Sequence, residues 1–422
     1  MPTKKELGMK TKIINVLKWI GLGFLEPIIR LISGDDVKKN TIQILKKIIF
    51  PVVAIFLFIG AWSSFADKLQ NKAIKNKYDS VEKKQGKEVA DNLMKQMQDP
   101  KSAERPKTLP TPSDIAGAYR SLKSEHKRIE KDKRKQIAAK TKVNNRKIKK
   151  WLKQTKPTEL VNADGEKVTV VPAELAKKFK SQRSSFFSFL SSTDFSPVGL
   201  IAEEYTGPPT FIDQVKTSLF NVFCGFLLAL FIAVPLGIFM GLSETLRDAI
   251  NPFIQVFKPV SPVVWYLLVY MIVTTLLPDG DDNTTFYITF IAVGLCAMWA
   301  TLVNTAVGVA SVDKDILNVS KVLKLGTFQH IFKVVLPASI PLIFTGLRIT
   351  MSVAWMVLIA IELLSSSPGL GTFVWEEYQG DALDSNSKII FAMLVIGFIG
   401  FLLDRIMLMI QNLASFEDET PT

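Results

Sequence analysis

Cysteine and histidine are scarce in this chain. Its 422 residues contain 2 cysteines, Cys224 and Cys296, and 2 histidines, His126 and His330. Both cysteines fall in apolar stretches, so no disulfide framework is expected, and no cluster offers the three or four ligands of a zinc site. The chain also lacks the GxxxxGK[ST] motif that holds nucleotide phosphates. We therefore expect no metal, no bound cofactor, no catalytic residues and no ATP hydrolysis by this chain alone.

Apolar runs of membrane length are abundant. Apolar residues make up 48% of the sequence, and the mean hydropathy is +0.23 although 22% of the residues are charged. A membrane-spanning helix needs about 20 mainly apolar residues. Six segments meet this requirement: Ile48–Ala66, Gln214–Gly241, Pro259–Pro278, Phe286–Ala310, Ile340–Leu364 and Lys388–Asn412. The sequence predicts an all-α polytopic membrane bundle.

The stretch Ile13–Ser33 is apolar but is interrupted by charged residues and a proline. A helix lying in the membrane interface explains it better than a seventh span. The lysine-rich start of the chain is not followed by a small-residue cleavage site, so we expect no cleaved signal peptide.

Charge in the short loops predicts the orientation. Lysine and arginine gather before the first span and in the loops around Arg247 and Lys321, whereas the alternate loops are acidic, near Asp281 and Glu377. Basic short loops stay in the cytoplasm. We therefore expect both termini and the loop 310–339 on the cytoplasmic side.

A long basic insert, Asp67 to Pro209, separates the first two spans. It is expected outside the cytoplasm, because long loops escape the charge rule. Its pattern predicts a charged helix over Ser113–Gln154, capped by Ser113 or Asp114, and a β-hairpin around Asp164-Gly165. A solvated spacer, a docking surface for a protein or lipid, and a nucleic-acid binder are the alternatives; sparse aromatic residues disfavour the last.

The loop 310–339 has the features of a structured element. Asp313 or Asp315 can cap a short helix running to about Leu325. The whole polar, partly helical stretch is expected to end at a proline stop, Leu336-Pro337. The apolar residues of this helix share one face: Ile316, Val319, Val322 and Leu323. On periodicity alone, the face packs on its own bundle; the alternative is docking to a partner.

Polar residues recur along the fifth predicted span. Arg348, Trp355 and Glu362 are each seven residues apart and are expected to share a face with Ser352 beside them. Ionisable groups in a membrane helix usually face the bundle interior or a water-filled path. Arg348 is either part of an anion pathway or paired with Asp404, and Trp355 and Trp299 serve either packing or the pathway.

Other spans carry weaker signals. Small residues in Pro235–Gly241 and Val307–Ala310 indicate close helix packing. Asp404-Arg405 at the end of the last span is interpreted as a local ion pair.

Several motifs in the C-terminal half resemble one family. They are the polar loop ending in Leu336-Pro337, Lys258–Trp265, Val303–Val309, Thr345–Arg348 and Leu403–Arg405. Together they resemble the membrane subunits of binding-protein-dependent ABC importers, closest to the nitrate/bicarbonate branch of the nitrate–sulfonate–taurine permeases, over about Pro208 to Leu413. In that family the loop is a coupling helix that fits a cleft on the ATPase subunit.

The loop departs from the family at two places. The usual Glu-Ala-Ala is Asn318-Val319-Ser320, and Lys324 stands at the usual glycine, with Gly326 two residues later. The residues that the resemblance assigns to ATPase docking are Asp313, Asp315, Ile316, Val319, Val322, Leu323, Lys324 and Gly326.

The resemblance implies an importer permease for a small inorganic anion, nitrate first, then bicarbonate or sulfonates. It implies a bacterial inner-membrane location, a second permease copy, lipid contacts, a periplasmic binding protein and separate ATPase subunits that hold ATP and Mg. A membrane anchor that presents the basic insert to a partner, and an ion-coupled secondary transporter, are the alternatives. The expected organisation is 1–47 cytoplasmic N-terminus, 48–66 first span, 67–209 insert, 210–413 permease core with coupling loop 310–339, and 414–422 tail.

Overall fold

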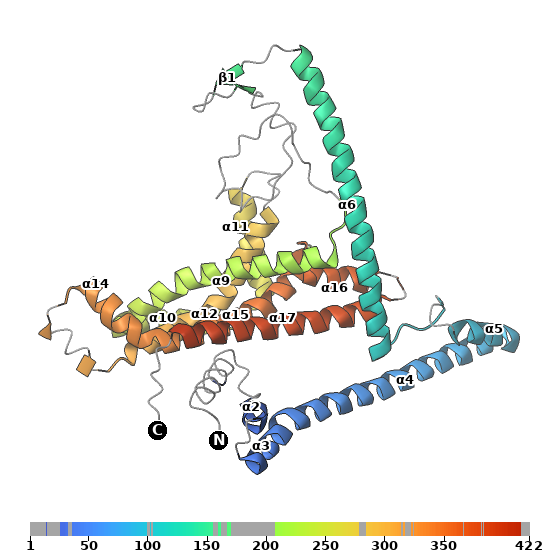
Figure 1. The fold of residues 1–422 in the computed structure, drawn as a ribbon, viewed down its shortest axis with the longest axis horizontal. Helices are drawn as coiled ribbons and strands as arrows, with labels where there is room; N and C mark the ends of the chain where they lie inside the picture. The colour runs from blue at the N-terminus through green and yellow to red at the C-terminus, as the bar shows by residue number, and fades with distance from the viewer. Residues whose placement is uncertain are drawn as a thin grey trace.

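A computed structural model describes residues 14, 26–32, 36–98, 102, 104–154, 159–161, 167–169, 207–277, 284–313, 315–316, 322–323, 325–365, 367–380, 382 and 384–414. The described chain is mainly helical (Figure 1). The helices before the core are α2 (Glu26–Ile32), α3 (Val37–Ile44), η2 (Leu45–Ile49), α4 (Phe50–Gln85), α5 (Lys87–Gln98) and α6 (Pro112–Gln154). The core has α9 (Phe211–Leu242), α10 (Glu244–Phe257), α11 (Pro262–Leu276), α12 (Thr284–Ala310), α14 (Thr327–His330), η3 (Ile331–Val335), α15 (Leu336–Ser365), α16 (Leu370–Gln379) and α17 (Ser385–Ala414).

The expected spans correspond to observed helices. Within the described residues, five helices are long and apolar enough to cross a membrane, and a sixth results if α10 and α11, bent by 103°, are counted as one span. The third predicted span, Pro259–Pro278, contains the 15-residue α11, which is counted as a span only together with α10. The prediction of an all-α polytopic membrane protein is confirmed.

Helices α9, α12, α15 and α17 lie side by side and carry the core (Figure 1). The largest cluster of buried apolar side chains joins α9, α11, α12 and α15, for example through Val222, Val293, Leu358 and Ile361. Helix α9 begins with a capping box, in which the Thr210 hydroxyl accepts the Asp213 N–H and the Asp213 carboxylate accepts the Thr210 N–H. Such a cap stabilises a helix by about 1 kcal/mol.

Small residues let α9 and α12 approach closely, as the sequence predicted. A Cβ added at Gly237 would lie 2.6 Å from the Thr305 Cβ, and one at Gly241 would meet the Val309 side chain. Between membrane helices, such close backbone contact replaces the hydrophobic driving force that lipid does not supply.

Replacing Gly237 by alanine is therefore expected to push α9 and α12 apart and destabilise the bundle by about 1–3 kcal/mol. The measurement is the melting temperature of the detergent-purified protein. Gly397→Ala on α17 is the matched control, because a Cβ there meets nothing within 4 Å. Equal melting temperatures for both variants would contradict the close-packing account.

The two ends of the bundle differ in charge. Helix α14 lies at one end, with α10 and Arg247, and α16 lies at the other (Figure 1). The acidic residues Glu376, Glu377 and Asp384 lie at the α16 end. Of the short loops that the orientation prediction uses, those around Arg247 and Glu377 thus lie at opposite ends, and Asp281 and Lys321 lie outside the described residues.

Helix α4 contains the first predicted span but does not end with it. The helix continues from the apolar residues into the polar sequence and ends at Gln85, next to Gly86 with a positive φ of 90°. The most apolar window of the span is 0% buried. Of the expected interfacial stretch Ile13–Ser33, only position 14 and α2 lie within the described residues.

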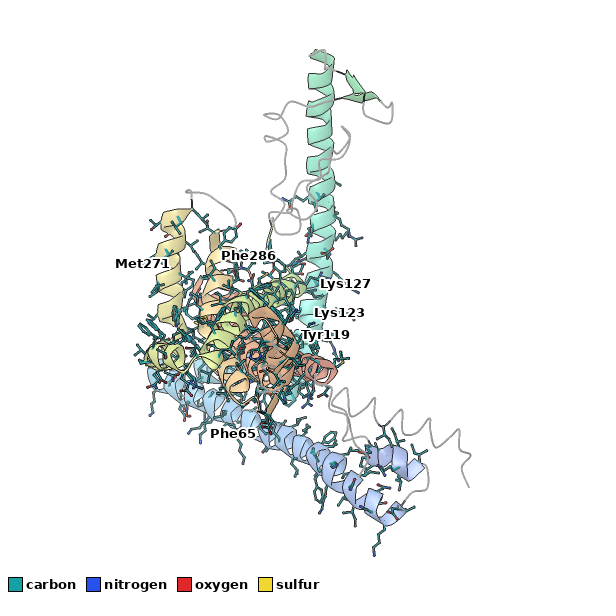
Figure 2. The ribbon with its side chains drawn as sticks, turned by 90° about the vertical axis from the view of Figure 1, so that its left-hand side faces the viewer. Phe65, Tyr119, Lys123, Lys127, Met271 and Phe286 are labelled. Atoms are coloured by element: carbon teal, nitrogen blue, oxygen red, sulfur yellow. The ribbon has the colours of Figure 1, made fainter. Side chains whose placement is uncertain are left out.

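The insert contains the predicted long helix. α6 has 43 residues and runs across the α16 end of the bundle, roughly perpendicular to α9 and α17, before it continues beyond them (Figures 1 and 2).

The predicted cap of this helix at Ser113 or Asp114 is wrong. The Thr111 hydroxyl accepts the Asp114 N–H at 3.3 Å, and the Asp114 carboxylate accepts the Thr111 N–H at 2.9 Å. The predicted hairpin is confirmed, with β1 (Glu159–Val161) antiparallel to β2 (Lys167–Thr169).

The first half of α6 is fastened to the bundle by polar and apolar contacts. Leu122 is buried in a cluster with Phe373 of α16 and Ala392 of α17. The Ser121 hydroxyl donates to Asp384 at 2.9 Å. Lys388 of α17 lies 3.7 Å from Glu125, and Lys133 lies 3.7 Å from Asp213 at the start of α9. The opposite side of α6 carries exposed lysines, including Lys123 and Lys127 (Figure 2).

Candidate functional site

The α14 end of the bundle presents large apolar side chains to solvent. Ile316 is 47% exposed, Val322 81% and Leu323 64%. Two further residues, Phe328 and Phe332, are 79% and 63% exposed, four residues apart on α14 and η3. We call these five residues the apolar knob. The sequence analysis missed the two phenylalanines, although their spacing on one helical face was visible.

The base of the apolar knob is anchored in the bundle. Val309, Val312 and Val335 form a buried cluster with Ile238 of α9. Asp313 acts as the predicted cap, since its carboxylate accepts the Asp315 N–H at 2.9 Å. Gly326 accepts the His330 N–H at 2.8 Å and so begins α14. Val319 and Lys324, the other expected docking residues, lie outside the described residues.

The prediction that Leu336-Pro337 stops a helix is wrong. α14, η3 and α15 follow one another without a break from Thr327 to Ser365. A proline ring clashes with the carbonyl four residues earlier in a regular α-helix. Here the preceding turn is π-helical, with the Leu336 N–H bonded to the Ile331 carbonyl, and this wider turn accommodates the ring. Phe328 and Phe332 of the apolar knob are consequently joined to a membrane-spanning helix by continuous helical backbone.

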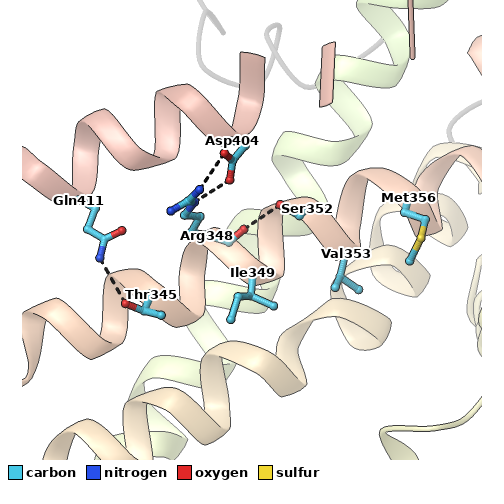
Figure 3. A pocket seen from close by; sticks show the side chains of 8 residues that line it. All are labelled: Thr345, Arg348, Ile349, Ser352, Val353, Met356, Asp404 and Gln411. Atoms are coloured by element: carbon cyan, nitrogen blue, oxygen red, sulfur yellow. Dashed lines mark hydrogen bonds and ion pairs between the residues drawn. The ribbon is translucent and has the colours of Figure 1, made fainter. Parts of the chain in front are cut away.

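Arg348 of α15 forms a bidentate ion pair with Asp404 of α17. The Nε and Nη2 atoms lie 2.6 and 2.9 Å from the two carboxylate oxygens (Figure 3). One turn away, Gln411 donates to the Thr345 hydroxyl at 3.2 Å. The interpretation of Asp404-Arg405 as a local pair is wrong, because Asp404 faces α15 while the Arg405 guanidinium lies 5.0 Å from the Phe401 ring centroid.

An open groove of about 510 Å³ runs along this ion pair. Its lining combines polar and apolar side chains: Thr345, Arg348, Ile349, Ser352, Val353, Met356, Asp404 and Gln411 (Figure 3). The Ser352 hydroxyl donates to the Arg348 carbonyl of its own helix at 3.2 Å.

The other polar positions of the predicted stripe are packed. Trp355 is 5% exposed, and its indole N–H donates to the Ile396 carbonyl of α17 at 3.1 Å. Trp299 is 8% exposed and stacks on Phe257 at 6.3 Å between ring centroids. Arg348 and Trp355 therefore both face α17, as the shared-face prediction requires.

Glu362 completes the stripe but faces other helices. Its side chain is 0% exposed, and one carboxyl oxygen accepts hydrogen bonds from Ser218 of α9 at 2.8 Å and from the Gly371 N–H at 3.0 Å. Glu362 is therefore held against a neighbouring span, α9, and against the start of α16. The Gly369-Leu370-Gly371 sequence was the missed signal for these partners.

Comparisons with known proteins agree with this architecture. Residues 233–414 match the family model described as binding-protein-dependent transport system inner membrane component. The nitrate import permease protein NrtB of Synechocystis sp. is 36% identical over 200 residues, which cover 47% of this chain and 68% of that protein. The bicarbonate transport system permease protein CmpB of Synechococcus elongatus is 35% identical over 200 residues, with the same coverage of each chain.

A solved structure of an inward-facing methionine ABC transporter aligns with 46% of this chain and 94% of its own chain, at a TM-score of 0.40 and 15% identity. With five or six apolar spans, the family-model match and relatives more than 30% identical over two thirds of their length, the chain belongs to the binding-protein-dependent inner membrane components, the non-enzymatic permease subunits of ABC transporters.

Proposed function

We propose that the chain is the permease subunit of an ATP-driven importer that moves a small inorganic anion, nitrate first, across the bacterial inner membrane. The names of the relatives support an inorganic anion, since they import nitrate or bicarbonate. Bicarbonate is the nearest competitor, and sulfonates such as taurine follow.

The apolar knob is the observation that carries the proposal. Its side chains are too exposed to serve the chain's own core, and exposed apolar patches mark interaction sites. The family implies ATPase subunits as partners, and these would hold ATP and Mg. We infer that the knob inserts into the ATPase subunit, so that closure of the ATPase pair is transmitted through η3 into α15.

We assign each partner to one side of the bundle. The basic α14 end is assigned to the cytoplasm with both termini. The acidic α16 end, with α6 across it, is assigned to the outside, where a periplasmic binding protein would dock. The exposed apolar surfaces of α4 and α17 fit lipid and a second permease copy.

The groove beside Arg348 is the candidate for an anion pathway. Arg348 and Ser352 line it, whereas Trp355, Trp299 and Glu362 are buried in helix contacts. A guanidinium can replace part of the solvation that an anion loses on leaving water. We therefore assign any pathway role to Arg348 and Ser352 and packing or positioning roles to the other three residues.

Co-purification separates this proposal from a membrane anchor. When the chain is expressed with the ATPase subunit encoded beside a nitrate-type permease and pulled down in detergent, the ATPase is expected in the eluate. A membrane anchor that only presents the insert would not retain the ATPase subunit. Absence of the ATPase subunit from the wild-type eluate would therefore overturn the assignment as an importer permease.

Labelling by an impermeant thiol reagent tests the orientation. After Cys224 and Cys296 are replaced by alanine, a cysteine at Tyr378, 71% exposed, is expected to react from outside in intact cells. A cysteine at Val322, 81% exposed, is expected to react only after the membrane is opened. Because both positions are accessible in the folded chain, the reverse pattern would contradict the proposed sidedness.

A further inference from the structure

We propose that Glu362 is a positioning residue that, in its protonated form, fastens the start of α16 to α9 and α15. The inference rests on the proposed function for its effect on transport, but the structural part stands independently. In this role Glu362 positions the helices at the outer end of the permease and does not line the anion pathway.

Glu362 supplies the cap that α16 lacks. The N-cap residue of α16 is Gly369, which has no side chain to accept the first amide protons. Two distant side chains accept them instead: Ser218 of α9 accepts the Leu370 N–H at 2.9 Å, and Glu362 accepts the Gly371 N–H at 3.0 Å. The Ser218 hydroxyl in turn donates to the same Glu362 oxygen at 2.8 Å. One carboxyl group therefore links three helices.

Glycine is required at two positions around this cap, because neighbouring atoms lie too close to the backbone to leave room for a Cβ. A Cβ at Gly369 would overlap the Glu362 carboxyl group, and a Cβ at Gly371 would overlap the Ile359 carbonyl oxygen. The Thr372 hydroxyl donates to the Glu362 carbonyl at 2.8 Å and holds the same turn. The chain between α15 and α16 thus folds tightly over the carboxyl, which is 0% exposed.

The surroundings of the carboxyl favour its neutral form. Among the described residues, the ion pairs closest to this end of the bundle use Lys388 and Lys133, and none includes Glu362. An ionised carboxylate buried in a membrane span without a cation is very costly, and such a group neutralises instead. Its second oxygen, Oε1, has no hydrogen-bond partner in the described structure, and neither does the side-chain amide of Asn221, which is 1% exposed and lies near the carboxyl on α9. A proton on Oε1 supplies the donor that an Asn221 oxygen would accept.

Three variants test the proposal in the assembled transporter. Glu362→Gln keeps the shape and the accepting oxygen of a neutral carboxyl, whereas Glu362→Ala removes both. Glu376→Gln is the matched control, because Glu376 is an exposed residue on the same α16. Hydrogen exchange of the Leu370 and Gly371 amides, the infrared band of a protonated carboxyl, and anion uptake are measured for each.

We expect amide exchange at the start of α16 to be roughly 5- to 100-fold faster in Glu362→Ala, because a buried acceptor is lost. Uptake should fall with it, while exchange in α12 stays unchanged. Glu362→Gln should retain slow exchange and uptake, and should lose a protonated-carboxyl band that the wild type and Glu376→Gln both show. If Glu362→Ala does not fold, Ser218→Ala, which removes one link only, should show the faster exchange at Leu370.

Two results would overturn the proposal. If Glu362→Gln behaves like Glu362→Ala and the wild type lacks the protonated band, the group acts as a charged carboxylate. If exchange at the start of α16 is unchanged in both Glu362→Ala and Ser218→Ala, neither side chain positions it. Absence of uptake in the wild type would instead count against the transport assignment, and the exchange and infrared results would still decide the role of Glu362.

Discussion

Aspartate at both Val322 and Phe328 is expected to abolish association with the ATPase subunit while the membrane bundle stays intact. These two side chains, 81% and 79% exposed, contribute little to the chain's own core. In a docked complex each charge would be buried without a partner, and burying charge in an interface costs about 2–5 kcal/mol. Pull-down of the ATPase subunit and ATP-driven uptake are the measurements.

Tyr378→Asp is the matched control for this double variant. Tyr378 is a similarly exposed large side chain, 71%, but it lies on α16 at the opposite end. It should leave ATPase association unchanged. Normal pull-down with the Val322 and Phe328 variant, in protein that melts at the wild-type temperature, would show that the knob does not dock.

Removing the charge of Arg348 is expected to destabilise the bundle. In Arg348→Met the aliphatic bulk is kept, but the Asp404 carboxylate loses two short hydrogen bonds. Hydrogen bonds to charged groups contribute about 1.5–3 kcal/mol, with the lower end expected here because the side chains are 35% and 25% exposed. The melting temperature in detergent should fall, and Asp404→Asn in the same protein should restore part of it.

Transport separates the structural role of this pair from a pathway role. If Arg348 only fastens α15 to α17, the rescued double variant should import anion at a near-normal rate. If it also lines the pathway, uptake should stay slow after stability is restored, although loaded binding protein still stimulates ATP hydrolysis. Normal stability and normal uptake in Arg348→Met would contradict both roles.

The spans could be predicted because they depend on local composition. Membrane helices need long apolar runs, and the loop charges alternate along the chain, so α9, α12, α15 and α17 follow from hydropathy. Helix ends were less predictable. Pro337 was expected to stop a helix, but the turn before it is π-helical and its Val335 packs against Val309 and Val312. A local sequence pattern does not report such long-range packing.

The polar contacts between helices show a second limit of prediction from the sequence. The spacing of Arg348, Trp355 and Glu362 predicted one shared face on α15, but only Arg348 and Trp355 face α17, whereas Glu362 contacts α9 and α16. Partner choice depends on which helices lie against each turn. The sequence left Asp404 with two candidate partners, Arg348 and its neighbour Arg405, and the packing of α17 against α15 decides for Arg348, 56 positions away. Likewise, the role of Ser218 becomes apparent only when α9 lies beside the α16 start.

Reconstitution of the complete transporter tests the central claim most directly. Proteoliposomes containing this permease, its ATPase subunit and binding protein loaded with nitrate, bicarbonate, taurine or no anion are assayed for ATP hydrolysis and anion uptake. We predict the largest stimulation and ATP-dependent uptake with nitrate. A larger response to bicarbonate or taurine would contradict the choice of nitrate, and no uptake of any of these anions by an assembled, hydrolysing complex would contradict the assignment as an anion importer.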